Sequence, residues 1–217
     1  MAVPSLPQAV AEEVRAAAAP GRGERAVRAL EEAVALLEAG RPAEALRRAE
    51  EAKALAHRSG AVREVLGMAL YGVERFRDAL RELLAYRRMT GRLDQNHLIA
   101  DCHRALGAPD RAVEAAREAL RASVPEEVRA EATVVGAAAL ADLGRYDEAL
   151  ALLRSFPTRD DVARPFDLRV WYMAGDVLER AGRPREAARE FARVVRHDPE
   201  AFDAGERLAR LAGTAEG

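Results

Sequence analysis

Residues 171–199, WYMAGDVLERAGRPREAAREFARVVRHDP, decide the fold of this chain. They contain two faces of small or apolar residues at three- and four-residue spacing, which is typical of two amphipathic helices. The first face consists of Trp171, Ala174, Gly175 and Leu178. The second face consists of Ala187, Phe191 and Val194. Gly182 and Pro184 interrupt the helix between them, and Pro199 ends the second helix. The stretch therefore predicts two helices joined by a tight turn.

The same pattern recurs four times upstream, and the turns lie 33 to 38 residues apart. The aligned turn residues are Gly40, Glu74, Gly107, Gly144 and Gly182. Seven residues before each turn stands a small residue: Ala33, Gly67, Ala100, Ala137 and Gly175. Five residues after each turn stands an alanine: Ala45, Ala79, Ala112, Ala149 and Ala187. Two helices approach closely only where side chains are small, so we predict that these alanines are buried. Positions nine after the turn, such as Leu83 and Phe191, are expected to pack between neighbouring hairpins.

This pattern resembles the tetratricopeptide repeat, a helix–turn–helix unit of about 34 residues. The tryptophan of the family pattern is present only at Trp171, and the other repeats have Ala29, Arg63, Asn96 and Thr133 there. The resemblance implies an all-α fold, a right-handed superhelix of antiparallel helix pairs (an α-solenoid). We expect an N-terminal amphipathic helix and linker over 1–22, five hairpins over 23–199, and a C-terminal capping helix and tail over 200–217.

Composition limits the classes of partner. The 217 residues are 49% hydrophobic and 32% charged, as in a folded globular protein, and no apolar run approaches the length of a membrane span. The net charge of −2 gives no reason to expect nucleic acid or a membrane surface as a partner. The single cysteine, Cys102, cannot form an internal disulfide, and we expect a cytoplasmic protein.

The resemblance implies that residues 13, 10, 6 and 3 positions before each turn line a concave groove. In the first repeat these residues are all apolar: Val27, Leu30, Val34 and Leu37. A solvated groove wall is not expected to be apolar. We expect an amphipathic helix over 5–18 to cover this stripe, and the alternative is a contact with a partner or a second copy.

Repeats two, three and five carry polar and aromatic residues at the groove positions, and we predict that they bind a ligand. The candidates are Glu64, Met68, Tyr71, Asp94, His97, Asp101, Arg104, Arg169, Tyr172, Asp176 and Glu179. With Glu131 of repeat four, six acidic groups face two arginines, which favours a ligand of basic character. Tyr71 and Tyr172 are the expected anchors. The alternative is that these are solvated helix positions without a ligand.

Asp94, His97 and Asp101 share one helical face, so a metal site or a general base is possible there. No second helix offers matching ligands, and a histidine–carboxylate hydrogen bond is the simpler interpretation. Cys102 lacks a catalytic partner at a suitable spacing, and we interpret it as a packing residue. Phosphate-binding and hydrolase motifs are absent from the sequence, and we expect no cofactor.

We therefore predict a non-enzymatic adaptor or scaffold of bacterial type that binds a protein or peptide of basic character in its groove. The alternative is a self-assembling homodimeric scaffold, so the chain is expected to be a monomer or a homodimer. A metal-dependent enzyme centred on Asp94, His97 and Asp101 is the third hypothesis.

Overall fold

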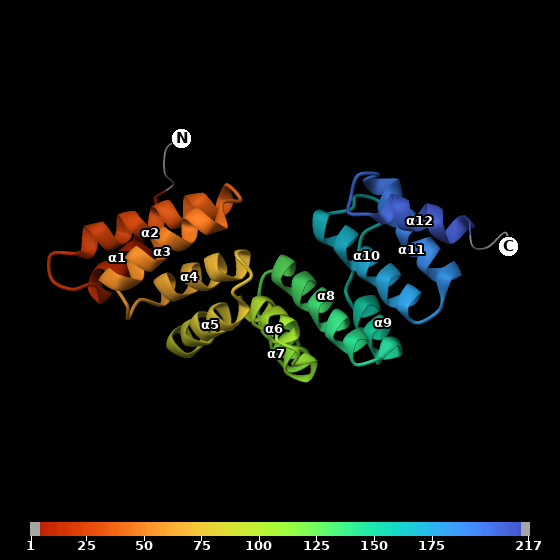
Figure 1. Cartoon of the computed structure of the whole chain (residues 1–217), viewed down its shortest axis with the longest axis horizontal. Coiled ribbons are helices and arrows are strands. Elements are labelled where there is room, and N and C mark those ends of the chain that lie inside the picture. Colours follow the sequence, from red (N-terminus) through yellow and green to blue (C-terminus); the bar gives the residue numbers. More distant parts are fainter. Residues whose placement is uncertain (1–4, 214–217) are drawn as a thin grey trace. The chain divides into compact units, whose positions relative to one another are not determined.

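The structure is a computed structural model, and it describes residues 5–213 (Figure 1). The outer ends of the predicted terminal segments, 1–4 and 214–217, lie outside the described residues. Within 5–213 the chain forms twelve α-helices and no β-strand. The helices are α1 (Gln8–Ala17), α2 (Gly23–Glu38), α3 (Pro42–Leu55), α4 (Gly60–Gly72), α5 (Phe76–Thr90), α6 (Asn96–Ala105), α7 (Pro109–Arg121), α8 (Glu126–Asp142), α9 (Tyr146–Ser155), α10 (Pro165–Arg180), α11 (Pro184–His197) and α12 (Ala204–Gly213).

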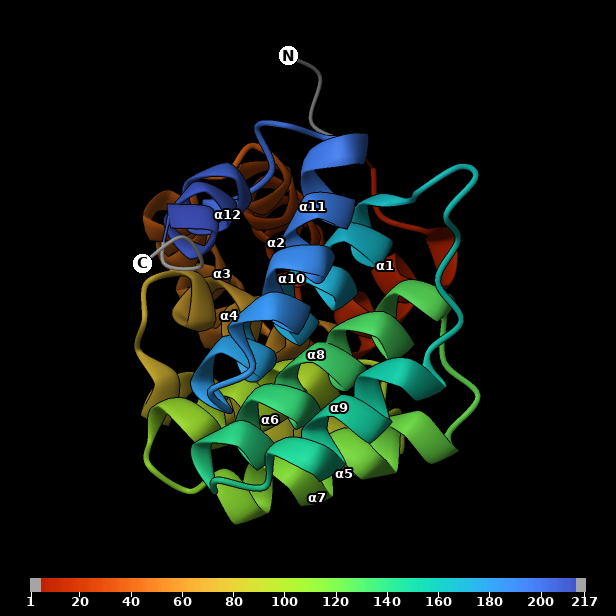
Figure 2. The same ribbon diagram turned by 90° about the vertical axis from the view of Figure 1, so that its right-hand side faces the viewer.

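The chain divides into two compact units, and the boundary falls between Leu106 and Gly107. The first unit contains α1–α6, in which α2 packs on α3 and α4 packs on α5. In the second unit α7 packs on α8, α8 on α9, and α10 on α11, whose side-by-side arrangement is visible in Figure 2. Helices that are adjacent in sequence thus pack as pairs. The boundary between the units falls at the turn of the predicted third hairpin, so that α6 belongs to the first unit and α7 to the second.

The five aligned turn residues share one backbone conformation. Each has a positive φ, between 60° and 73°. Glycine adopts this left-handed region without steric cost, which explains why four of the five positions are glycine. Glu74, with φ of 60°, is the one non-glycine residue at these turns. The shared geometry supports the alignment of the repeats across the whole chain.

The small residues lie where the paired helices approach most closely. All five predicted alanines are completely buried, as expected. A Cβ atom added to Gly67 would lie 2.7 Å from Leu83, and one added to Gly175 would lie 2.7 Å from the Phe191 ring. Leu83 and Phe191 thus each fill the space that a glycine leaves within their own hairpin, and Phe191 also contacts Arg207 of the next helix, α12.

The terminal helices are shorter than predicted. The helix expected over 5–18 begins after Pro7, and the terminal helix begins only at Ala204. Helix α1 packs on α2 and α4, so the apolar stripe of the first repeat is buried at Val27 and Leu30. Its remaining members, Val34 and Leu37, are half-buried.

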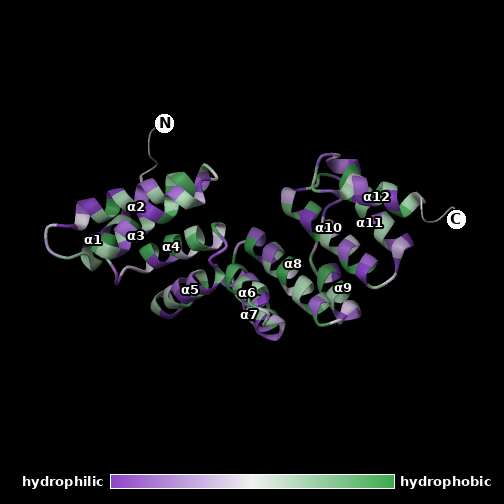
Figure 3. Ribbon diagram, viewed as in Figure 1, coloured by the Kyte–Doolittle hydropathy of each residue, from purple (hydrophilic) through white to green (hydrophobic). Residues whose placement is uncertain are grey.

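Figure 3 shows polar and apolar residues alternating around the helices, as expected where one side of each helix packs and the other meets solvent. None of the helices within residues 5–213 has the length and apolar character needed to cross a membrane.

Candidate ligand-binding surface

In the first unit, α4 and α6 face each other through side chains that the sequence predicts to line the groove. The Tyr71 hydroxyl on α4 donates a 2.6 Å hydrogen bond to Asp101 Oδ2 on α6. Immediately before α6, the Gln95 amide donates at 2.8 Å to Glu64 Oε1 on α4. The other predicted side chains of this region are half-buried: Met68, Asp94, His97 and Arg104. The structure thus brings the candidates of repeats two and three together.

In the second unit, the candidates on α10 contact the terminal helix. Arg207 of α12 donates to Asp176 Oδ1 at 2.9 Å and to Glu179 Oε2 at 2.7 Å. The Tyr172 hydroxyl donates a 2.5 Å hydrogen bond to Asp203, directly before α12. Because only 9% of Arg207 is exposed, this basic side chain is itself part of the packing. Tyr172, Asp176 and Glu179, three of the four candidates on α10, therefore already have partners near or on α12.

The acidic excess that the sequence suggested is almost fully offset by arginines of the same chain. Five of the six carboxylates form an ion pair: Asp94 with Arg92, Asp101 with Arg104, Glu131 with Arg169, and both Asp176 and Glu179 with Arg207. Two of these arginines, Arg92 and Arg207, do not lie at the predicted groove positions, so the comparison of acidic with basic residues at those positions left them out. Glu64 is the exception, because its contacts are with the neutral Gln95 amide and Tyr86 hydroxyl.

Glu64 lines a hollow of about 370 Å³ in the first unit. Its apolar walls come from three helices and include Val10 of α1, Leu30 and Val34 of α2, and Ala61 of α4. We call this space the Glu64 hollow. Its volume falls within the range of about 300–1,000 Å³ that small-ligand pockets occupy.

The electrostatic setting of Glu64 is unusual for a carboxylate in this chain. Burial raises the pKa of Glu64, and the Gln95 hydrogen bond offsets this only in part. Tyr86, also in the wall, donates a 2.8 Å hydrogen bond to Asp94 Oδ1. Burial and that hydrogen bond raise the pKa of Tyr86, so the hydroxyl stays protonated at neutral pH. Arg92 lines the hollow as well, but its ion pair is with Asp94.

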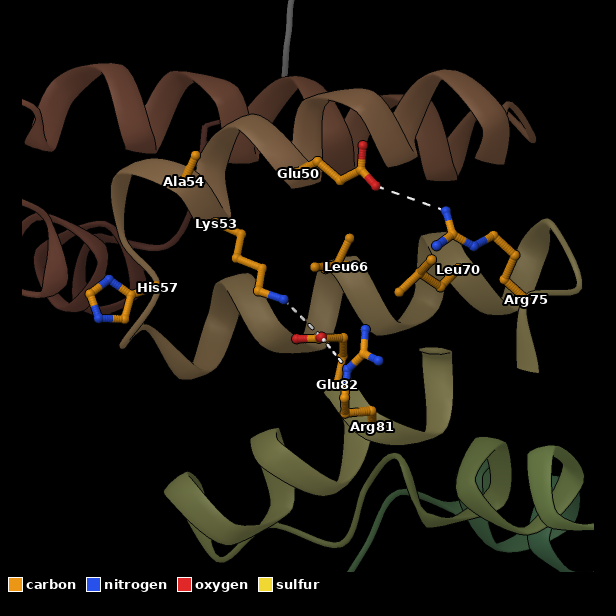
Figure 4. A pocket seen from close by; sticks show the side chains of 9 residues that line it. All are labelled: Glu50, Lys53, Ala54, His57, Leu66, Leu70, Arg75, Arg81 and Glu82. Atoms are coloured by element: carbon orange, nitrogen blue, oxygen red, sulfur yellow. Dashed lines mark hydrogen bonds and ion pairs between the residues drawn. The ribbon is translucent and has the colours of Figure 1, made fainter. Parts of the chain in front are cut away.

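A second hollow, of about 330 Å³, lies between α3, α4 and α5 (Figure 4). Figure 4 shows Lys53 and Arg81 converging on Glu82, which is only 1% exposed. Glu82 accepts hydrogen bonds from Lys53 at 2.8 Å and from Arg63 at 2.6 Å. Burial alone would raise the pKa of Glu82, but these two bonds hold it below its ordinary range. The cations here balance an internal carboxylate, so the loss of one of them would leave a buried charge only partly compensated.

The sequence did not predict the Glu82 cluster, although it contained one signal. Arg63 stands at the position of the family tryptophan in the second repeat, where a charged residue is unexpected on a packing surface. An arginine at a packing position requires a counter-charge, and Glu82 on the paired helix supplies it.

The structure does not support the hypothesis of a metal site at Asp94, His97 and Asp101. Within residues 5–213, no group of three or more histidine, cysteine, aspartate or glutamate side chains is arranged to hold a metal ion. Cys102 is completely buried, and burial followed by the charge of Asp101 raises its pKa to about 12. A thiol in this setting is a packing group, as predicted.

The comparisons with known proteins agree with this architecture. Residues 99–200 match the family model described as tetratrico peptide repeat. A thermophilic TPR protein of Thermus thermophilus, TTC0263, has a similar structure, with a TM-score of 0.67 and 19% identity over 85% of this chain and 97% of that one. No significant match was found among curated proteins.

Two further solved structures are described with a ligand or a ligand site. YrrB, described as a TPR protein with an unusual peptide-binding site, has a TM-score of 0.58 and 18% identity over 88% of this chain and 91% of that one. The human IFIT1 dimer with m7Gppp-AAAA has a TM-score of 0.65 and 18% identity. The match covers 87% of this chain but only 46% of the IFIT1 chain. With its helices in pairs and its five aligned turns, the chain has the fold of tetratricopeptide repeat proteins, and residues 99–200 match the model of that family.

Proposed function

We propose that this protein is a non-enzymatic adaptor that binds an extended segment of a partner protein on its first unit, along α2, α4 and α6. The observation that supports this most is the meeting of Tyr71 and Asp101 across α4 and α6, beside the half-buried Met68 and His97. A tyrosine held by a hydrogen bond offers a large contact area with few rotatable bonds to immobilise.

The proposal narrows the predicted surface. Tyr172, Asp176 and Glu179 contact residues of or next to α12, and Arg169 is paired with Glu131. Binding a partner there would require these contacts to be broken. In the first unit, Tyr71 and Asp101 contact each other and are both half-buried.

Random peptides displayed on phage and selected on the immobilised full chain test this function. Peptides that bind are expected to lose about 30-fold or more in affinity with Tyr71→Ala, as for an interface anchor. The matched control is Tyr146→Ala, a half-buried tyrosine at the start of α9 in the other unit, which should leave affinity unchanged. Circular dichroism would verify that both variants stay helical. Selection without any binding peptide would refute the adaptor function.

The alternative is a homodimeric scaffold, and the half-buried Val34 and Leu37 on α2 favour it as a contact surface. It predicts a dimer in sedimentation equilibrium that Leu37→Glu converts to a monomer. A protein that is monomeric over the accessible concentration range would contradict this alternative.

A further inference from the structure

The Glu64 hollow combines an apolar wall with a carboxylate that the chain leaves without an ion-pair partner. Val10, Leu30 and Val34 provide the apolar surface, and Glu64 and Tyr86 provide polar atoms. Gln95 occupies Glu64 Oε1, and no described lysine, arginine or histidine forms an ion pair with this side chain. Arg92 in the wall attracts Glu64 electrostatically but forms its ion pair with Asp94. An apolar-walled hollow with a carboxylate that has no ion-pair partner is complementary to a cation on an aliphatic stem.

The second unit shows how this fold receives a basic side chain from elsewhere. The Arg207 guanidinium of α12 lies 4.6 Å from the centre of the Phe191 ring, and it binds Asp176 and Glu179. The aliphatic part of Arg207 is buried, and its charge is neutralised by two carboxylates of α10, the first helix of its hairpin. The Glu64 hollow offers the same two elements, apolar walls and a carboxylate on the first helix of a hairpin. In this hollow, however, no described lysine or arginine forms an ion pair with the carboxylate.

We propose that the Glu64 hollow binds a lysine side chain of the partner segment, with its methylene groups against Val10, Leu30 and Val34 and its ammonium group on Glu64. Lysine fits better than arginine, because Gln95 already occupies one carboxylate oxygen and a guanidinium binds best to two. This inference rests on the proposed adaptor function, and it adds the identity of one required ligand residue and its place on the surface.

The test uses peptides selected on the full chain, resynthesised with each lysine replaced in turn by norleucine, which retains the stem and lacks the ammonium group. One such replacement should weaken binding to the wild-type protein by about tenfold to a hundredfold, the range for a hydrogen bond to a charged group. The same replacement should cost nothing further in Glu64→Gln, because the two changes remove the same interaction. Ala61→Leu, which narrows the hollow without changing its charge, should weaken the lysine peptides similarly.

The matched control is Glu131→Gln, since this carboxylate of α8 is already paired with Arg169 and should not respond to the peptide's lysine. Peptides that bind and depend on Tyr71, but tolerate norleucine at every lysine or lose equally in Glu64→Gln, would overturn this inference and leave the adaptor function intact. A preference for arginine over lysine at the sensitive position would overturn the assignment of lysine. Selection without any binding peptide would overturn both proposals.

Discussion

The carboxylates of α10 and α4 stand in opposite electrostatic settings, although the sequence assigned both to one class of groove residue. Burial alone would raise the pKa of Glu179 on α10, but hydrogen bonds from Arg210 and Arg207 bring it below its ordinary range. Burial likewise acts on Glu64 of α4, where no arginine donates a hydrogen bond to oppose it, and its pKa is raised. The difference lies in what the neighbouring terminal helix supplies.

The two terminal helices contribute groups of opposite charge to the helices they pack against. Helix α12 inserts Arg207 among the acids of α10. Helix α1 supplies an acid, because Glu13 accepts 2.7 Å hydrogen bonds from the Ser59 hydroxyl and the Gly60 amide at the start of α4. The C-terminal helix thus satisfies the acids of its unit, whereas the N-terminal helix forms one wall of a hollow around an acid that has no ion-pair partner. This comparison teaches that acidic composition alone does not identify a binding surface, because arginines elsewhere in the chain can neutralise it.

The largest effect is expected where a carboxylate is fully buried and paired. Arg63→Met removes one of the cations of Glu82 and leaves the charge only partly compensated, so unfolding free energy should fall by about 3 kcal/mol at pH 7. The pKa of Glu82 is lowered, so its stabilising contribution is present above the pKa of the unfolded chain and is lost as pH falls through the folded value. Urea unfolding should therefore show a smaller difference at pH 3.

The control for this variant is Arg75→Met, because about half of the Arg75 side chain is exposed and its partner is a surface aspartate. Its expected cost is below about 1 kcal/mol. Equal costs for the two variants would contradict the assignment of a buried ion pair.

The next effect concerns α12 itself. Arg207→Met retains an apolar stem but leaves Asp176 and Glu179 half-buried without their shared cation, and we expect a loss of about 2 kcal/mol in unfolding free energy. Arg210→Met, on the same helix and 56% exposed, should cost less than about 0.5 kcal/mol. If both arginines prove equally dispensable, α12 does not neutralise α10.

The features that the sequence predicted well are those that backbone geometry imposes. A turn that needs positive φ selects glycine, and helices in close contact select alanine, so both recur visibly in the sequence. The helix ends were less predictable by a few residues, as at Gln8, where no side-chain hydrogen bond caps the helix, and at Ala204.

The pairing of charges could not be predicted, because it depends on which distant side chains meet. Trp171 and Arg63 occupy the same position in their repeats, but their partners differ. The Arg193 guanidinium lies 4.3 Å from the centre of the Trp171 ring, whereas Arg63 forms an ion pair with Glu82. The acidic excess failed as evidence for the same reason. Arg92 follows a helix and Arg207 belongs to a helix outside the repeats, so neither entered a count made at repeat positions.

A cation placed on α1 should give Glu64 the kind of electrostatic setting that Glu179 has beside Arg207. Ala9 lies on α1 in the wall of the Glu64 hollow, and Ala9→Lys places an ammonium group beside it. We expect a gain of about 0.2–1 kcal/mol in unfolding free energy at neutral pH, and weaker capture of lysine peptides by competition within the chain. Ala9→Gln, of similar reach and without charge, should do neither. Unchanged peptide binding in Ala9→Lys would separate the hollow from the ligand site.

The smallest expected effect is the most specific, because its sign is opposite to that of the changes at Arg63 and Arg207. Removing the charge of Glu64 should stabilise the free protein, whereas removing a charge at Glu82 or Arg207 destabilises it. The folded-state pKa of Glu64 is raised, so its contribution to stability is fully present below the pKa of the unfolded chain and is lost as pH rises through the folded value. Glu64→Gln stays neutral throughout and avoids that loss.

The melting temperature of Glu64→Gln relative to wild type should therefore rise with pH, with little difference near pH 4 and a small gain at pH 7. Glu179→Gln is the control with the reverse trend, because the pKa of Glu179 is lowered: it should cost stability at pH 7 and less as pH falls below the unfolded pKa. A loss of stability for Glu64→Gln at pH 7 would mean that a cation already compensates this carboxylate. The distinction between the two acids would then disappear, and the case for a lysine from outside the chain with it.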